Sequence, residues 1–316
     1  MPVEPRSFHH SAYSASRISA ARSELRLSVS VCLPARECAG TVGAIVEALC
    51  GLKADGAIDE LAVVDAASED GTADVAARAG AAVWQQDELV RELGPALGKG
   101  DAMWRALSRL RGDLVCFLDA DTEGFSPHFA CGLIGPLVCE PDVWFVKGHY
   151  RRPIEHAGSL HADGGGRVNH LTARPALALF YPELAAVRQP LAGEVAARRE
   201  LLERIPFATG YGVEVAMLID AWREVGVERI AQVDLDEHRN PHQPLSALAP
   251  MALTVLATIA RRLERDGRLA PALARGAPAD LGPPERPPLR AARAHASPLQ
   301  EARASGVQDA RERVRA

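Results

Sequence analysis

Short apolar runs of strand length alternate with segments of helical period along residues 25–150, and this alternation restricts the fold more than any other feature. The runs that predict strands are 27–33, 61–65, 82–84, 114–118 and 143–146. Helices are predicted between them: one with Val42, Ile45, Val46 and Leu49 on one face, one from a cap at Asp70 or Thr72 to Ala79, and one over 101–111. This order is typical of an α/β fold, a mostly parallel sheet flanked by helices.

The chain becomes more helical after residue 150. We expect helices over 167–180, 194–204, 212–225 and 245–265 and a strand over 230–233. The folded unit therefore divides into a nucleotide-binding half, 25–150, and an acceptor-binding half, 151–270. Residues 1–24 are rich in Ser, and residues 271–316 are rich in Pro, Ala and Arg without an aromatic residue, so both ends are predicted to be disordered.

The composition disfavours several classes of partner. The chain holds 36 Lys and Arg against 41 Asp and Glu, a net charge of −5, so a concentrated basic surface for nucleic acid is not expected. The longest apolar stretch, 247–260, is broken by Pro250 and Thr254 and is shorter than the roughly 20 residues that span a bilayer. Residues 1–24 lack the apolar segment of a secretory signal, and the six cysteines contain no C-x-x-C pair. We expect a cytoplasmic protein that binds neither nucleic acid nor membrane.

Two carboxylates stand where the predicted strand 114–118 ends, in the triplet Asp119-Ala120-Asp121. Ligands of open α/β sheets bind at the carboxyl ends of strands, and carboxylate oxygens are preferred ligands of Mg²⁺ and Mn²⁺. Acidic residues also cap ordinary turns, so the strand placement is what favours a metal site here.

Other polar motifs are predicted at the same edge of the sheet. Pro34-Ala35 ends the first strand, and Asp65 ends the second with Ser68 close behind. Lys99 stands between two glycines at the start of a predicted helix, where it can approach the phosphates or the base of a nucleotide. The alternative for Gly98-Lys99-Gly100 is a plain surface loop.

An ordered series of short motifs runs from about residue 28 to residue 265. It comprises Leu33-Pro34-Ala35, Val64-Asp65, Gly98-Lys99-Gly100, Asp119-Ala120-Asp121, Val146-Lys147, Tyr150-Arg151-Arg152-Pro153, Gly164-Gly165-Gly166-Arg167-Val168, Gln189-Pro190-Leu191, Gly193-Glu194 and Gly210-Tyr211-Gly212-Val213-Glu214. The series resembles the retaining GT-A glycosyltransferases that make glucosyl-3-phosphoglycerate. The resemblance implies a UDP-glucose donor, a 3-phosphoglycerate acceptor, an essential divalent cation (Mg²⁺ or Mn²⁺) and a homodimer.

The resemblance also implies roles for individual residues of the donor site. The nucleotide-sugar site would comprise Pro34, Ala35, Glu37, Asp65, Ser68, Lys99, Asp119, Ala120, Tyr211 and Glu214, with Tyr211 and Glu214 on the glucose hydroxyls. Glu37 belongs to this set only if it replaces an acidic residue that the family usually has nearer the Pro-Ala pair. Tyr211 and Glu214 have a plainer alternative as a buried Tyr and an acidic residue at a helix N-terminus.

The acceptor and the metal have their own residues. Gly166, Arg167 and Val168 would receive the phosphate and carboxylate of the acceptor, together with Asn169, which stands where the family commonly has Thr, and Asn240. A flexible linker is the alternative for the glycines. The metal ligands would be Asp121 and one histidine of a shifted His-x-Asn element, either His238 or His242; the alternative is that both histidines are ordinary loop residues.

The reaction implied is transfer of glucose to the 2-hydroxyl of 3-phosphoglycerate with retention, and the catalytic residues would be Asp121, Lys99 and Glu214. Glu214 is not assigned as a nucleophile, because the leaving phosphate can take the acceptor proton on the same face. Two alternatives stay open: a mannosyl-3-phosphoglycerate synthase that uses GDP-mannose, and a non-catalytic relative that binds nucleotide sugars. A nucleotidyltransferase is disfavoured, because no Gly-rich basic loop follows the first strand.

Overall fold

The computed structural model describes residues 4–156, 159–161, 164–239, 243–269 and 284–294, and its centre is an eight-stranded sheet in the order β1-β11-β6-β9-β5-β2-β3-β4. The strands are β1 (Arg6–His9), β2 (Val29–Ala35), β3 (Glu60–Asp65), β4 (Ala82–Gln85), β5 (Leu114–Phe117), β6 (Phe145–Arg151), β9 (Val195–Arg198) and β11 (Ile230–Glu237). All neighbours pair in parallel except β9, which is antiparallel to both β5 and β6. The α/β fold with a mostly parallel sheet is therefore confirmed.

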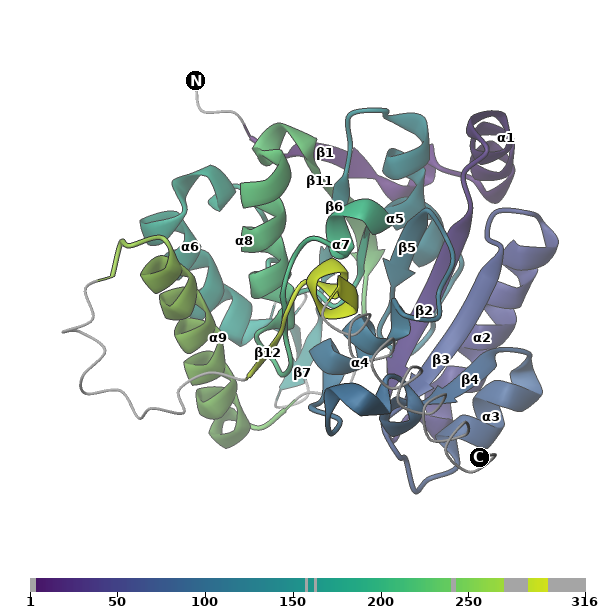
Figure 1. Cartoon of the computed structure of the whole chain (residues 1–316), viewed down its shortest axis with the longest axis horizontal. Helices are drawn as coiled ribbons and strands as arrows, with labels where there is room; N and C mark the ends of the chain where they lie inside the picture. Colours follow the sequence, from purple (N-terminus) through teal and green to yellow (C-terminus); the bar gives the residue numbers. More distant parts are fainter. Residues whose placement is uncertain (1–3, 157–158, 162–163, 240–242, 270–283, 295–316) are drawn as a thin grey trace, which may run out of the picture.

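Helices cover both faces of this sheet (Figure 1). One face packs against α1 (Ala15–Leu25), α2 (Ala39–Ala54), α3 (Thr72–Ala79) and α5 (His128–Cys139), and the other against α4 (Lys99–Ala106), α6 (Arg174–Phe180), α8 (Val213–Val225) and α9 (Leu245–Arg265). Alternate residues of β5 serve the two cores: Leu114 and Cys116 join the first, Val115 and Phe117 the second. The continuous apolar run of this strand follows from burial on both faces.

Smaller elements stand outside the main sheet. A single helical turn, α7 (Arg199–Leu202), follows β9 directly. Two short antiparallel pairs are separate from the main sheet: β7 (Ile154–His156) with β8 (Ser159–His161), and β10 (Phe207–Ala208) with β12 (Glu285–Arg286). The second pair joins segments that are far apart in the sequence.

The predicted disorder of residues 1–24 is wrong for the part that the structure describes. β1 pairs in parallel with β11 at the edge of the sheet, and α1 packs against α5. Although the segment is rich in Ser, it carries apolar side chains that pack into the core: Ile18 is fully buried and Tyr13 is 5% exposed. Strand pairing with a segment more than 220 residues away supplies the stabilisation that local composition does not indicate.

Two predictions in the C-terminal half are corrected. The segment 194–204 is not one helix, because Val195–Arg198 forms β9 between β5 and β6 before α7 begins. A buried apolar run of this length does not distinguish helix from strand by periodicity, so the flanking strands decide. The predicted disorder of 271–316 is wrong for residues 284–294, which contain β12 and pack Leu289 into the core. Residues 271–283 and 295–316 lie outside the described residues.

Helix α9 is, within the described ranges, the one helix whose length and apolar composition would suffice to cross a membrane. It exceeds the 247–260 stretch because its apolar pattern continues past Ala260 to Leu263. Val255, Ile259 and Leu263 are buried in the core, and the guanidinium of Arg262 is buried in ion pairs. Its C-terminal part is thus integrated into the folded unit, whereas Leu245, Leu253 and Leu256 are exposed.

Gly135→Ala tests the docking of the N-terminal segment. A Cβ at Gly135 in α5 would lie 2.1 Å from Cγ of Tyr13, so the ring must move and the free energy of unfolding should fall by about 1–3 kcal/mol. Gly51→Ala is the matched control, because a Cβ at this exposed position of α2 meets nothing within 4 Å. Urea unfolding measures both, and an unchanged stability of Gly135→Ala would contradict the docked position of Tyr13.

Candidate active site

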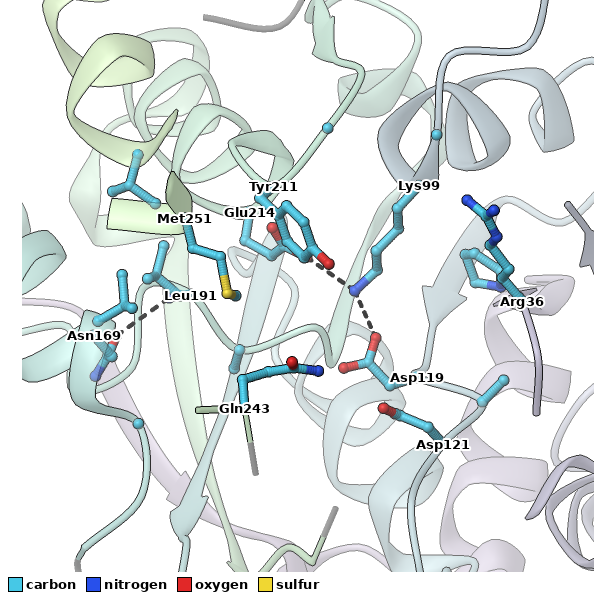
Figure 2. Close-up of a pocket in the computed structure, with 18 of the residues that line it drawn as sticks. Arg36, Lys99, Asp119, Asp121, Asn169, Leu191, Tyr211, Glu214, Gln243 and Met251 are labelled. Atoms are coloured by element: carbon cyan, nitrogen blue, oxygen red, sulfur yellow. Dashed lines mark hydrogen bonds and ion pairs between the residues drawn. The ribbon is translucent and has the colours of Figure 1, made fainter. Parts of the chain in front are cut away.

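A cleft of about 550 Å³ opens at the carboxyl ends of β2 and β5, where an α/β sheet presents its ligand site. Its lining joins both halves of the chain: Pro34, Ala35, Arg36, Lys99, Asp119, Ala120 and Asp121 with Arg152, Gly166, Arg167, Val168, Asn169, Gln189, Tyr211, Glu214, Gln243 and Met251. Most of the residues predicted for the donor and acceptor sites therefore lie around one cavity. Figure 2 shows the two carboxylates and Lys99 facing this space.

Lys99 connects two carboxylates that come from different halves of the chain. Its Nζ lies 2.6 Å from Oδ1 of Asp119 and 2.9 Å from Oε1 of Glu214, as the dashed lines in Figure 2 show. Burial alone would lower the pKa of Lys99, but the two negative charges outweigh it and raise the pKa well above its usual value. Lys99 is therefore a permanent cation in the cleft.

Steric constraints explain why Gly98 and Gly100 flank Lys99. The alternative that Gly98-Lys99-Gly100 is a plain surface loop is wrong. Gly98 has φ +93°, and α4 begins at Lys99. A Cβ on Gly100 would lie 1.8 Å from the carbonyl oxygen of Ala208, so this turn packs directly on the segment that leads to Tyr211.

The acidic pair after β5 carries more negative charge than Lys99 offsets. Burial, and then the negative charge of Asp119, raise the pKa of Asp121. Gly193 lies against Asp119, because a Cβ there would come within 2.2 Å of both carboxylate oxygens. Two carboxylates at positions i and i+2 after a strand match the oxygen ligands that Mg²⁺ and Mn²⁺ prefer, and a bound cation would relieve their repulsion.

His238 lies behind the acidic pair in a buried polar network. Its Nε2 lies 3.1 Å from Oε1 of Glu194 and 3.0 Å from Oγ1 of Thr122, and its ring stacks on Tyr150 with 4.4 Å between centroids. The hydroxyl of Tyr150 donates to Glu194 at 2.7 Å. His238 Nδ1 is buried without a hydrogen-bond partner. A cation bound at this nitrogen would displace the proton that it carries in the charged ring, because metals bind neutral imidazole.

The pair His238 and Glu194 is held in its charged forms. Burial would raise the pKa of Glu194, but the charge of His238 and the hydrogen bonds from His238 and Tyr150 lower it. Burial would lower the pKa of His238, but the charge and hydrogen bond of Glu194 raise it. Of the two histidines predicted as alternative ligands, His238 lies near enough to Asp121 for its charge to affect the pKa of that carboxyl. The other, His242, lies outside the described residues, as does Asn240.

The structure does not bring the predicted metal ligands together completely. Among the described residues, one group of three ligand atoms lies within 4.8 Å of one another, and it consists of His9, His10 and Asp236 outside the cleft. Asp121 and His238 supply a suitable set of donors for a divalent cation, but they are not part of such a group.

Three residues predicted for the nucleotide lie beside the cleft lining and bond to one another. Oγ of Ser68 donates to Asp65 at 2.6 Å and accepts from the backbone N–H of Glu37 at 2.9 Å. The carboxylate of Glu37 accepts from the backbone N–H of Glu69 at 3.0 Å. In this structure these side chains hold the ends of β2 and β3 together, and none of them lines the cavity.

The residues predicted to bind the acceptor differ in whether their side chains are available to a ligand. Gly166 has φ +67°, and Arg167, next to it, lines the cleft and donates to the carbonyl of Gln243 at 2.6 Å. Asn169 is 5% exposed and uses its amide inward, donating to the carbonyl of Arg188 and accepting from the N–H of Leu191. The arrangement offers Arg167 to an anion and uses Asn169 to hold the 188–191 segment.

Sequence reasoning missed several residues of the site. Arg36 and Arg152 line the cleft, and Lys147 is buried behind it with its Nζ on the carbonyl of Ala192. Burial, which outweighs the nearby carboxylates, lowers the pKa of Lys147 to about 8. Lys147, Tyr150, Arg152 and Glu194 all belong to motifs of the series, but the sequence assigned them no role. Only the partners across the sheet show that Tyr150 and Glu194 hold His238.

The sheet, the Asp-x-Asp pair at the end of β5 and the cleft at its carboxyl edge define a GT-A-type glycosyltransferase. The model of the family described as glycosyl transferase family 2 matches residues 30–153. The chain is 45% identical to the glucosyl-3-phosphoglycerate synthases of Petrotoga mobilis and Mycolicibacterium smegmatis, over 67% and 74% of this chain and 65% and 77% of theirs. The chain belongs to the glucosyl-3-phosphoglycerate synthase family.

Solved structures agree with this assignment. The mannosyl-3-phosphoglycerate synthase of Rubrobacter xylanophilus is 47% identical with a TM-score of 0.79, covering 85% of this chain and 87% of its own. The glucosyl-3-phosphoglycerate synthase of Mycobacterium tuberculosis, in a complex with Mn²⁺, UDP-glucose and phosphoglyceric acid, is 35% identical with a TM-score of 0.79. That match covers 92% of this chain and 99% of the mycobacterial one.

Glu194→Gln tests the buried pair through the pH dependence of stability. The lowered pKa of Glu194 adds stability above its usual 4.5, lost as the pH falls through the lowered value. The raised pKa of His238 adds stability below its usual 6.5, lost as the pH rises through the raised value. The wild type and the variant should therefore differ most between pH 4.5 and 6.5, by about 1.5–3 kcal/mol in the free energy of unfolding.

Urea unfolding from pH 3 to pH 9, with a chelator present, measures this difference. The control is Glu88→Gln, which removes only an exposed ion pair with Arg91. A difference between the wild type and Glu194→Gln that stays constant across the pH range would contradict the charged pair.

Proposed function

We propose that the protein transfers glucose from UDP-glucose to the 2-hydroxyl of 3-phosphoglycerate with retention at the anomeric carbon. The observation that carries this proposal is the single cleft lined by Asp119, Lys99 and Glu214 and also by Arg167. The mycobacterial relative of the same fold holds Mn²⁺, UDP-glucose and phosphoglyceric acid. The cleft supplies a carboxylate edge for a cation and a basic wall for an anionic acceptor.

On the donor side, the backbone around Pro34 and Ala35 borders the space for the uracil, and Asp119 faces the ribose and diphosphate. Lys99 keeps a positive charge beside the place where negative charge develops on the leaving group. Tyr211 and Glu214 enter the cleft from the start of α8 and are positioned for the glucose hydroxyls.

Asp121 and His238 would hold the divalent cation, Mg²⁺ or Mn²⁺. When bound, such a cation neutralises the diphosphate and stabilises it as the leaving group. Relatives from Mycobacterium tuberculosis are solved with Mn²⁺ or with Mg²⁺ beside UDP. Burial, and then the negative charge of Asp119, raise the pKa of Asp121, and a bound cation would offset both, which supports this assignment.

On the acceptor side, Arg167 offers a planar guanidinium to the phosphate or carboxylate of 3-phosphoglycerate. Gly166 and Val168 line the cleft next to it, and Asn240 is proposed from the resemblance alone. Arg152, which packs against Gly165, adds positive charge to the same part of the cleft lining. A phosphorylated carboxylic acid carries several negative charges, which suits a wall built from arginines.

The chemistry exchanges one carbon–oxygen bond for another. The bond between the anomeric carbon and the diphosphate oxygen breaks, the bond to the acceptor 2-oxygen forms on the same face, and the acceptor proton passes to the leaving phosphate. Glu214 accepts a hydrogen bond from Lys99, so its role is to bind sugar and to hold Lys99 rather than to attack the anomeric carbon. Lys99 in turn offsets part of the negative charge of the two carboxylates.

GDP-mannose is the competing donor, because the Rubrobacter xylanophilus relative is a mannosyl-3-phosphoglycerate synthase and is 47% identical to this chain. The experiment is to incubate the protein with UDP-glucose or GDP-mannose, with and without 3-phosphoglycerate and Mg²⁺ or Mn²⁺, and to identify the product by NMR. We expect glucosyl-3-phosphoglycerate with an α-linkage. A mannosylated product instead would establish the alternative donor, and no nucleotide release in any mixture would favour a non-catalytic binding protein.

Asp121→Ala should lower kcat/KM for UDP-glucose by a factor of about 10² or more, because a charge that stabilises the leaving group is lost with the cation. Binding of Mn²⁺ in the presence of UDP should weaken in parallel. Asp87→Ala, at an exposed position away from the cleft, is the control. Unchanged turnover of Asp121→Ala at saturating substrate would rule out this mechanism.

We also propose that the enzyme is a soluble cytoplasmic homodimer. Large exposed leucines gather on two adjoining parts of the fold, Leu171 and Leu179 on the α6 side and Leu245, Leu253 and Leu256 on α9. Leu245 and Leu253 are eight residues apart on one helix, and they are 74% and 53% exposed. Apolar side chains collected in this way are typical of an interface between subunits.

Leu253→Glu should convert the dimer to a monomer, because a buried interface does not accommodate an unpaired charge. Light scattering coupled to size-exclusion chromatography measures the mass. The control is Leu25→Glu, at a leucine of similar exposure (54%) on α1. A wild type that is monomeric at all concentrations would contradict the proposal, as would dissociation caused equally by both variants.

A further inference from the structure

Residues 284–294, which we call the C-terminal strap, are built into the fold beside the donor site. β12 of the strap pairs with β10, with Phe207 opposite Arg286. The backbone N–H and the hydroxyl of Thr209 both donate to the carbonyl of Pro284, at 3.1 and 2.7 Å. Leu289 is 1% exposed in the core. The strap is therefore a surface segment with one buried face, seen in Figure 1 as the yellow segment close to α4.

Arg286 is the polar centre of the strap. Its Nε donates to Asp101 at 2.5 Å, and its Nη2 donates to the carbonyl of Pro95 at 2.7 Å. The guanidinium also lies over the ring of Trp104, at 5.4 Å from the centroid, while Nε1 of Trp104 donates to the carbonyl of Pro287 at 2.9 Å. Asp101 is fully buried, so these contacts satisfy an interior charge.

Asp101 belongs to the turn that carries Lys99. It stands in the first turn of α4, and its carboxylate accepts from the N–H of Leu97 at 2.8 Å and from Arg105 at 2.8 Å. The carboxylate thus closes the loop that leads into Lys99. Arg286 supplies the second cation on this carboxylate, from the strap.

The strap also reaches Lys99 through β10. The N–H of Gly100 donates to the carbonyl of Thr209 at 3.1 Å, so the turn of Lys99 lies on the end of β10 while the strap lies on its pairing edge. Thr209 leads directly to the segment with Tyr211 and Glu214. Three segments from distant parts of the chain are thus linked by hydrogen bonds: β10 bonds to the strap on one side and to the Lys99 turn on the other.

We propose that the C-terminal strap completes the donor site and that Arg286 is a positioning residue that sets Lys99 against Glu214. Its effect on UDP binding rests on the proposed function, whereas its effect on the backbone at Gly100 does not. The ion pair between Lys99 and Glu214 spans only 2.9 Å, so a small displacement of either segment breaks it. Misplacement of a reacting group by about 1 Å can cost a factor of about 10² in rate.

Arginine is required by the geometry of the contacts. Its planar fork serves Asp101 and the carbonyls of Leu93 and Pro95 at once. A lysine keeps the charge but offers a single ammonium, which does not reproduce these directions. Arg286→Lys therefore separates positioning from simple charge balance.

The experiment compares Arg286→Lys and Arg286→Ala with Arg290→Ala. The side chain of Arg290 pairs instead with Glu203 and is about half exposed, so it controls for a lost arginine in the strap. Hydrogen exchange of the metal-free, ligand-free proteins reports on the amide of Gly100, calorimetry gives the Kd for UDP with Mn²⁺, and steady-state kinetics give KM values for the donor and the acceptor.

For Arg286→Lys we expect the amide of Gly100 to exchange about tenfold faster or more, since its partner Thr209 is less well held. The Kd for UDP should rise about tenfold and kcat/KM for UDP-glucose should fall about a hundredfold, whereas KM for the acceptor should not change. Arg290→Ala should match the wild type in all three measurements.

A folded Arg286→Lys variant with Gly100 exchange and UDP affinity like the wild type would overturn the proposal, even if its Tm fell. If Arg286→Ala does not fold, the full-length Arg286→Lys variant alone provides the test. Faster Gly100 exchange with a raised Kd for UDP then supports the proposal, and wild-type values of both overturn it. If the wild type binds no UDP, the proposed function fails while Gly100 exchange still tests the strap.

Discussion

The ion pairs of Lys99 are the contacts on which the rest of the site depends. Asp119 arrives at the end of β5 and Glu214 at the start of α8, and Lys99 bonds to both within 2.9 Å. Carboxylates from two segments would otherwise repel each other in a partly dehydrated cleft. One cation on a turn that packs against the 208–209 backbone therefore sets the distance between the two halves of the donor site.

The charges of the cleft explain how a chain with a net charge of −5 can hold two anions. Asp119, Asp121 and Glu214 face the cavity with Lys99, so the donor side has more negative charge than its lysine balances. A divalent cation fits this excess. The acceptor side has the opposite character, because Arg152 and Arg167 line it. Net charge alone therefore says little about which ligands a cleft selects.

The parts of the fold and site that depend on neighbouring residues could be predicted from local sequence patterns. The strands β2 to β5 and the carboxylates at the end of β5 follow from apolar runs and from the rule that ligands bind at strand ends. Segments stabilised by distant partners were not predictable in this way: β1 pairs with β11, and the strap pairs with β10. The sequence also did not predict which polar side chains bond to the protein itself. Nothing near Asn169 in the sequence shows that its amide donates to the carbonyl of Arg188.

The antiparallel direction of β9 has the largest consequence for function. A strand that runs parallel to β5 would bring its C-terminal end to the ligand edge of the sheet, whereas β9 brings its N-terminal end. Gly193 therefore lies against Asp119, and Glu194 reaches His238 and Tyr150 behind the acidic pair. A helix over 194–204 would have placed neither residue there. The single reversed strand thus converts a nucleotide-binding edge into one that also holds a histidine beside two carboxylates.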